Sequence, residues 1–84
     1  MRYYVYILRS ENYPDKTYVG YTSDLRRRLY RHNGGFVAST QRFLPWRLET
    51  YISFSDRLMA MRFERYLKTG SGIAFKRKRF SKSR

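Results

Sequence analysis

The run YYVYIL at residues 3–8 constrains the fold of this chain more than any other feature. It is rich in β-branched and aromatic residues, which favour strands. Both of its alternating faces are apolar or aromatic, so we expect a central strand that is covered on each side. Because 84 residues make a single domain, which we take as residues 1–84, the following elements must provide that cover.

A second short strand is predicted at residues 17–21, which read TYVGY. The polar stretch between the two strands contains Pro14 and Asp15, a typical turn signal. The two strands should therefore pair as an antiparallel hairpin. Gly20, near the end of the second strand, indicates a bend or a close approach of another group to the backbone.

A helix is predicted next, with Thr22 or Ser23 as its N-cap and Asp24 in its first turn, where the helix dipole favours an acid. It should run to about Asn33, because two glycines follow. The segment FVASTQRFLPW has room for one short helical turn before Pro45.

The second half of the chain predicts a third strand and a second helix. Residues 47–54 alternate, with Leu48, Ile52 and Phe54 on one side. Ser55 should cap a helix over residues 56–68, ended by a glycine. Its expected core stripe is Met59, Ala60, Phe63, Tyr66 and Leu67.

The predicted fold class is α+β, with a small three-stranded antiparallel sheet flanked by helices in the order β-β-α-β-α. The basic tail IAFKRKRFSKSR is compatible with one further short helix, and the residues after about 80 are expected to fray.

The charge of the chain restricts its partners. Nineteen Lys and Arg residues against six Asp and Glu residues leave a net charge of +13, which a polyanion would relieve. Nucleic acid is the favoured polyanion, because no basic amphipathic helix early in the chain suits an acidic membrane surface. With 19% aromatic residues, the chain is no disordered basic tail.

Several other classes of protein are excluded by composition. The chain has no cysteine, so a disulfide framework, a zinc knuckle and thiol chemistry are all ruled out. It contains no apolar run of about 18 residues, and its start lacks a signal-peptide cleavage site. We therefore expect a cytoplasmic protein that does not span a membrane.

The first predicted helix places its basic residues unequally. Leu25 and Leu29 define the buried stripe, and Arg28 and His32 fall on the same side at about 100° per residue. Arg28 can simply cover apolar surface there, and His32 can be a satisfied histidine at the end of a helix. The remaining arginines form a solvated face, consisting of Arg26, Arg27 and Arg31.

Glu64 and two tyrosines need a similar comparison of alternatives. Glu64 can pair with Lys68 one turn later, but it is the acid that local structure explains least. Tyr6 and Tyr18 lie on paired strands, and their side chains can share a face. Such tyrosines usually pack, and exposed aromatics among basic residues can instead stack on single-stranded bases.

Taken in order, these motifs resemble the GIY-YIG endonuclease superfamily. YVY at residues 4–6 stands for the GIY motif, and YVG at residues 18–20 stands for YIG. The helix with Arg28 and His32 and the later helix with Glu64 follow at similar positions. The stretch ERYLKTGSG is similar to small stand-alone bacterial members, which are akin to the N-terminal nuclease domain of the excinuclease.

The resemblance implies a role for each of five residues. Glu64 would bind one Mg²⁺ or Mn²⁺, held weakly without substrate because Mg²⁺ keeps its waters and expects phosphate ligands. Tyr6 would be the general base or orienter of the attacking water, and Tyr18 would support the water or a phosphate oxygen. Arg28 would hold the scissile phosphate, and His32 would assist that network or the leaving group. A phenol has a pKa near 10, so Tyr6 as base needs a nearby cation, such as Arg28 or the metal, to lower it.

The sequence departs from the family pattern in two places. Tyr4 stands where the first motif has Gly, and no Asn follows Glu64, although many members carry one there. The implied activity is a metal-dependent DNA endonuclease, structure-selective or weakly sequence-specific, acting in repair or recombination. A non-catalytic nucleic-acid binder on the same scaffold is the alternative, and RNA and the oligomeric state are left open.

Contacts to nucleic acid are expected from a set of basic side chains, which would read backbone and shape rather than sequence. The set consists of Arg26, Arg27, Arg31, Arg42, Arg47, Lys68, Lys76, Arg77, Lys78 and Arg79.

Overall fold

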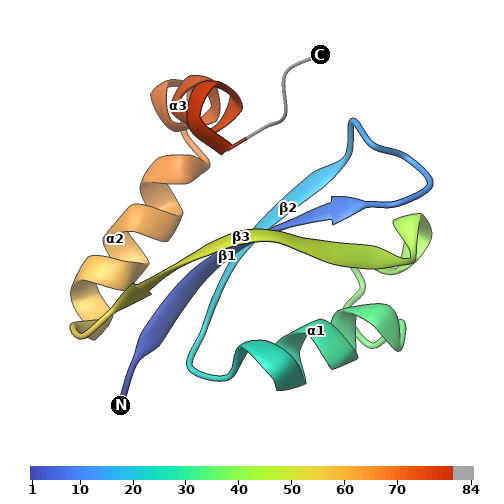
Figure 1. Cartoon of the computed structure of the whole chain (residues 1–84), viewed down its shortest axis with the longest axis horizontal. Helices are drawn as coiled ribbons and strands as arrows, with labels where there is room; N and C mark the ends of the chain where they lie inside the picture. The colour runs from blue at the N-terminus through green and yellow to red at the C-terminus, as the bar shows by residue number, and fades with distance from the viewer. Residues whose placement is uncertain (81–84) are drawn as a thin grey trace.

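A computed structural model describes residues 1–80 of the chain, and its centre is a three-stranded antiparallel sheet (Figure 1). The strands are β1 (Tyr3–Ser10), β2 (Thr17–Thr22) and β3 (Trp46–Phe54), arranged in the order β2-β1-β3. The hairpin of β1 and β2 is confirmed, and β1 is the central strand, as its two apolar faces predict.

Helices cover both faces of this sheet. One face carries α1 (Leu25–Asn33) and the 3-10 turn η1 (Gln41–Phe43), and the other carries α2 (Arg57–Leu67) and α3 (Gly70–Phe80) (Figure 1). The α+β class and the element order are confirmed, with the further helix as α3. The frayed end expected after about residue 80 lies outside the described residues. None of the helices in residues 1–80 is both long enough and apolar enough to cross a bilayer.

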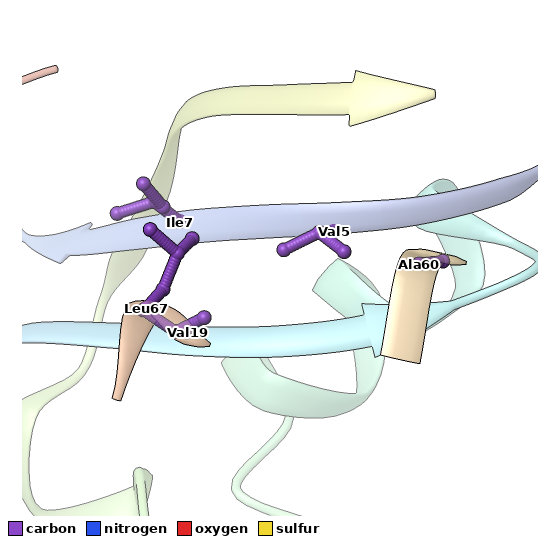
Figure 2. Packing of buried hydrophobic residues seen from close by; sticks show 5 residues of the cluster. All are labelled: Val5, Ile7, Val19, Ala60 and Leu67. Carbon is purple, nitrogen blue, oxygen red and sulfur yellow. The ribbon is translucent and has the colours of Figure 1, made fainter. Parts of the chain in front are cut away.

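One half of the core lies between the sheet and α2. Val5, Ile7 and Val19 project from β1 and β2, and Ala60 and Leu67 meet them from the helix. Figure 2 shows Leu67 pointing toward Ile7 and Val19. All five side chains are at most 5% exposed. Burial on this scale is the main force that holds the helix on the sheet.

The other half of the core lies between the sheet and α1. Its buried members are Tyr6, Leu8 and Trp46, and Leu25 and Leu29 of α1 pack against them. Tyr6 therefore belongs to the opposite face of the sheet from Val5 and Ile7, as the alternation of a strand requires. Packing on this face positions the aromatic side chains of the candidate site.

An irregularity in the pairing of β1 with β3 corrects one prediction. The register shifts between Ile7 and Leu8, so that one more residue of β3 is used than of β1. As a result, Leu48 packs on the α1 face, whereas Phe54 packs on the α2 face. The prediction that Leu48, Ile52 and Phe54 share one side is wrong, because a bulge interrupts strict alternation.

The N-caps of both long helices are aspartates. The Asp24 carboxylate accepts a hydrogen bond from the backbone N–H of Arg27 at 3.1 Å, and Asp56 does the same for Met59 at 3.0 Å. The predicted serine and threonine caps are therefore wrong by one or two residues. An aspartate caps as well as a serine and also adds a favourable charge at the N-terminus.

The core stripe of α2 is narrower than predicted. Ala60, Phe63 and Leu67 face the sheet, but Met59 is 56% exposed and Tyr66 is 40% exposed. Three positions spaced by three and four residues are enough to cover the small sheet, so the flanking positions stay in contact with solvent.

Candidate active site

Tyr6 is buried at the centre of the sheet, on the face that α1 covers. It is 1% exposed and pairs across the hairpin with Gly20 of β2. The phenol lies over the backbone of that glycine, which confirms the close approach expected at Gly20.

His32, at the end of α1, meets Tyr6 directly. The Tyr6 hydroxyl lies 2.9 Å from Nε2 of His32, and His32 is fully buried. The ring of Tyr18 joins them, with its centroid 4.9 Å from that of His32 and 6.3 Å from that of Tyr6. Three residues that lie far apart in the sequence thus form one aromatic cluster.

The second nitrogen of His32 has a partner that the sequence did not suggest. Nδ1 lies 2.8 Å from Oγ1 of Thr40, which is also fully buried. Thr40 lies in the irregular segment between α1 and η1, where no periodic pattern marks it. The only signal available was general: a buried histidine needs a hydrogen-bond partner at each ring nitrogen.

Burial sets the protonation of this cluster. It raises the pKa of Tyr6 to about 12, with a further increase from Tyr18 and a smaller one from Glu64. The hydrogen-bonded Arg28 guanidinium opposes this and lowers the pKa of Tyr6, as expected, but it does not outweigh burial. Burial also lowers the pKa of His32, followed by the charges of Arg28 and Arg31. At neutral pH both the phenol and the imidazole are therefore uncharged.

Arg28 differs in position from the other arginines of α1. It is half-buried and hydrogen bonds to Tyr6, whereas Arg26, Arg27 and Arg31 are exposed, as the helical wheel predicts. Arg27, Arg28 and Arg31 line a polar cavity of about 410 Å³ at the start of α1. Three cations around one hollow suit the phosphates of a nucleic-acid backbone.

Glu64 pairs with Lys68, as its local alternative predicts. Its carboxylate lies 2.6 Å from the Lys68 ammonium, and its side chain is 22% exposed. The same ammonium lies 5.8 Å from the ring centroid of Tyr18, and the charge of Glu64 acts on Tyr6. The pair thus borders the aromatic cluster as well as satisfying α2.

A metal ion at Glu64 would need most of its ligands from elsewhere. Within residues 1–80, no three acidic, histidine or cysteine side chains come together as a ligand cluster. One carboxylate at a partly exposed position fits a Mg²⁺ or Mn²⁺ ion that keeps its waters and gains phosphate oxygens from a substrate.

Two more cavities contain basic residues from the predicted nucleic-acid set. Lys68 and Lys76 line one of about 270 Å³, next to Tyr18. Lys76 and Arg77 line another of about 410 Å³, and Lys76 donates a hydrogen bond to Oγ1 of Thr17 at 3.1 Å. Burial, Arg9 and Arg77 lower the pKa of Lys76.

The other members of the set are dispersed. Arg47 pairs with Glu49 at 3.1 Å, and Arg79 lies over the ring of Phe75. The remaining three are exposed, on α1, η1 and α3 respectively: Arg26, Arg42 and Lys78. The structure therefore brings Arg27 and Arg31 close to Arg28, and Lys68 and Lys76 close to Tyr18, but does not unite all ten.

Comparison with known proteins gives concordant matches. A model of the GIY-YIG catalytic domain matches residues 2–78. A structure-specific endonuclease subunit SLX1 from Scheffersomyces stipitis is 41% identical over 69 residues, which are 74% of this chain and 20% of that protein. An SLX1 homolog from Giardia intestinalis is 32% identical over 65 residues, 73% of this chain and 18% of that protein. The chain thus spans about a fifth of the length of these relatives.

A solved structure has a similar fold. It is the solution NMR structure of the UPF0213 protein BH0048 from Bacillus halodurans, with a TM-score of 0.53 and 32% sequence identity. The match covers 89% of this chain and 81% of that one. Since the family model spans nearly the whole chain and the motif residues meet in one site, this protein belongs to the GIY-YIG catalytic domain family.

Proposed function

We propose that this chain is a divalent-metal-dependent endonuclease that hydrolyses phosphodiester bonds in DNA and selects for structure more than for sequence. The observation that carries the proposal is the buried 2.9 Å hydrogen bond between Tyr6 and His32, with Arg28 bonded to the same phenol. A merely structural tyrosine does not need both a base and a cation at its hydroxyl. Relatives named as structure-specific endonucleases support the same reaction class.

Tyr6 and His32 act together as the base. A pKa of about 12 means that forming the phenolate beforehand at neutral pH costs about 7 kcal/mol. Tyr6 therefore takes a proton from the attacking water while its own proton passes to Nε2 of His32. The lowered pKa of His32 keeps the imidazole neutral, so that Nε2 can accept this proton.

Arg28 supplies the positive charge that the reaction needs. Its guanidinium can hold two oxygens of the scissile phosphate and stabilise the negative charge that develops on them. The water oxygen bonds to phosphorus, the bond from phosphorus to the leaving sugar oxygen breaks, and that oxygen takes a proton from solvent. An arriving phosphate also offsets the charges of Arg28 and Arg31, so His32 becomes a better proton acceptor when substrate is bound.

Glu64 would hold the divalent ion, together with water and phosphate oxygens. When bound, the ion supplies Lewis-acid charge at the phosphate and helps the leaving oxygen depart. Because Lys68 already neutralises the carboxylate, its ammonium must move away for the ion to bind. This competition predicts weak ion binding in the absence of DNA.

The basic surface would position the substrate. Arg27 and Arg31 extend the charge of Arg28 along α1, and Lys68 and Lys76 extend it past Tyr18. Such contacts bind backbone phosphates, so they favour a branched or distorted DNA of suitable shape over a particular sequence. We infer a role in DNA repair or recombination and a cytoplasmic location from this substrate class.

A nicking assay tests the proposal. The chain is incubated with branched and plain duplex DNA, with and without Mg²⁺ or Mn²⁺, and compared with Glu64→Ala and with Glu11→Ala as a matched control. Glu11 is an exposed acid in the turn after β1. We expect cleavage by the wild type and by Glu11→Ala only. Cleavage that survives Glu64→Ala, or that needs no divalent ion, contradicts the metal site.

A non-catalytic nucleic-acid binder is the second candidate. The observation that favours it is the 2.6 Å pair of Glu64 and Lys68, which satisfies the carboxylate without a metal. Tight, salt-sensitive binding of branched DNA with no cleavage in any of these samples would establish this alternative.

A further inference from the structure

Thr40 lies behind His32, on the side of the imidazole away from Tyr6. Its Oγ1 is 2.8 Å from Nδ1 of His32, and both side chains are fully buried. Water is thus kept from this bond, and the direction of the bond decides which ring nitrogen carries the hydrogen.

The hydroxyl of Thr40 has a second partner that settles this direction. Oγ1 lies 3.3 Å from the carbonyl oxygen of Val37, which can only accept. The hydroxyl has one hydrogen and donates it there, so its oxygen must accept from His32. Nδ1 therefore carries the imidazole hydrogen, and Nε2 is bare.

The other side of the imidazole leads to the same assignment. Arg28 hydrogen bonds to the Tyr6 oxygen, and a guanidinium can only donate. The phenol hydrogen is thus directed to Nε2 of His32, which must be an acceptor. Two independent partners, one at each nitrogen, require the same tautomer.

Thr40 is itself held in place by the sheet. Its carbonyl oxygen accepts a hydrogen bond from the indole N–H of Trp46 at 2.8 Å. The backbone of Trp46 is bonded in turn to the side chain of Asn33, which accepts from its N–H at 2.6 Å and donates to its carbonyl at 2.9 Å. The start of β3 thereby ties Thr40 to the end of α1.

We propose that Thr40 is a positioning residue, which holds His32 in the Nδ1–H tautomer so that Nε2 receives the proton of Tyr6. The catalytic part of this inference rests on the proposed endonuclease function. The tautomer itself is a property of the folded chain and needs no activity. With the opposite tautomer, an N–H would face the phenol and Tyr6 would have no base.

Nitrogen NMR tests the tautomer directly. The chain has one histidine, so its two ring nitrogens are assigned without ambiguity. In ¹⁵N-labelled protein at a pH where His32 is neutral, we expect a protonated Nδ1 and an unprotonated Nε2. A protonated Nε2 in the wild type overturns the proposal, whether or not the protein cleaves DNA.

Two variants separate positioning from packing. Thr40→Ser keeps the hydroxyl and should keep the tautomer, while Thr40→Val keeps the shape and should raise the Nε2–H population. In the nicking assay, Thr40→Val should lower kcat by about 10- to 100-fold with KM little changed, and Thr40→Ser should restore most of it. Equal kcat values in Thr40→Val and the wild type contradict the positioning role.

The outcomes remain distinguishable if one part fails. A wild type that shows the expected tautomer but cleaves no DNA refutes the proposed function and leaves the assignment of Thr40 in place. If Thr40→Val does not fold, the spectrum of the wild type still decides the tautomer, and Thr40→Ala provides the second variant. Loss of the Nδ1–H signal in Thr40→Ser would contradict the assignment of the hydroxyl as acceptor.

Discussion

The phenol of Tyr6 occupies the space that any side chain on Gly20 would fill. A β-carbon at residue 20 would lie 2.2 Å from the Tyr6 hydroxyl oxygen and 2.3 Å from the ring carbon that carries it. Neither distance is compatible with van der Waals contact. Glycine in the second motif is thus a requirement of the site, because it lets the reactive end of Tyr6 rest on the backbone of β2.

Replacing Gly20 should disable the site without unfolding the chain. In Gly20→Ala, the added methyl group pushes the phenol away from His32, and overpacking of this kind costs about 1 to 3 kcal/mol. We expect at least a tenfold loss of nicking activity with a folded circular dichroism spectrum. Gly70→Ala is the control, since a β-carbon there has no neighbour within 4 Å. Wild-type activity in Gly20→Ala would show that the position of the phenol is not critical.

Removing the hydroxyl of Tyr6 separates chemistry from packing. Tyr6→Phe keeps the ring in the core but leaves Nε2 of His32 as a buried acceptor without its donor, which costs about 1 to 3 kcal/mol. Cleavage should fall by about 10²- to 10⁴-fold, as expected when a general base is lost. Tyr51→Phe, which changes the residue paired with Tyr6 on β3, is the matched control in nicking and urea denaturation. Equal losses in the two variants would argue against a special role for Tyr6.

Two neighbouring arginines should give different kinetic effects. Arg28→Ala removes the guanidinium bonded to Tyr6 and should lower kcat by about 10²-fold. Arg27→Ala removes an exposed charge and should weaken DNA binding while reducing the salt slope by about one. Nicking kinetics and binding isotherms at several salt concentrations distinguish the two. The prediction is contradicted if Arg27→Ala lowers kcat as much as Arg28→Ala.

Acid should destabilise the fold through His32. Its folded-state pKa lies below the ordinary 6.5, so the unfolded chain binds more protons between the two values. The stability that neutral His32 contributes is therefore complete above about pH 6.5 and is lost as pH falls from there through the lower folded-state pKa. Urea denaturation between about pH 7.5 and pH 5 should show this loss, and His32→Gln should flatten it. A slope unchanged in His32→Gln would contradict the assignment to this residue.

Much of the fold follows from local sequence signals. The two apolar faces of residues 3–8 require a central strand, and the turn and glycine signals place the hairpin and the end of α1. The errors arose where one residue decides the outcome. The bulge opposite Ile7 and Leu8 moved Leu48 to the other face from Phe54, and no local pattern encodes a bulge.

The candidate site shows a similar division. Periodicity alone places Arg28 and His32 on the inner side of α1, and both are found there. That Tyr18 shares their site depends on the packing of α1 against β1 and β2. The direction of the pKa shift of Tyr6 also depended on packing, because burial outweighs the charge of Arg28.

By itself, the sequence determined the central strand, the family motifs and the excess of basic charge, because these depend on residue type and on spacing within one element. Only the tertiary structure decided which atoms of these elements meet. It placed the Tyr6 hydroxyl on Gly20, directed it to Nε2 of His32, and set Thr40 behind that histidine. Hydrogen bonds between buried groups depend on tenths of an ångström, and packing of the whole chain, rather than local preference, fixes distances at that scale.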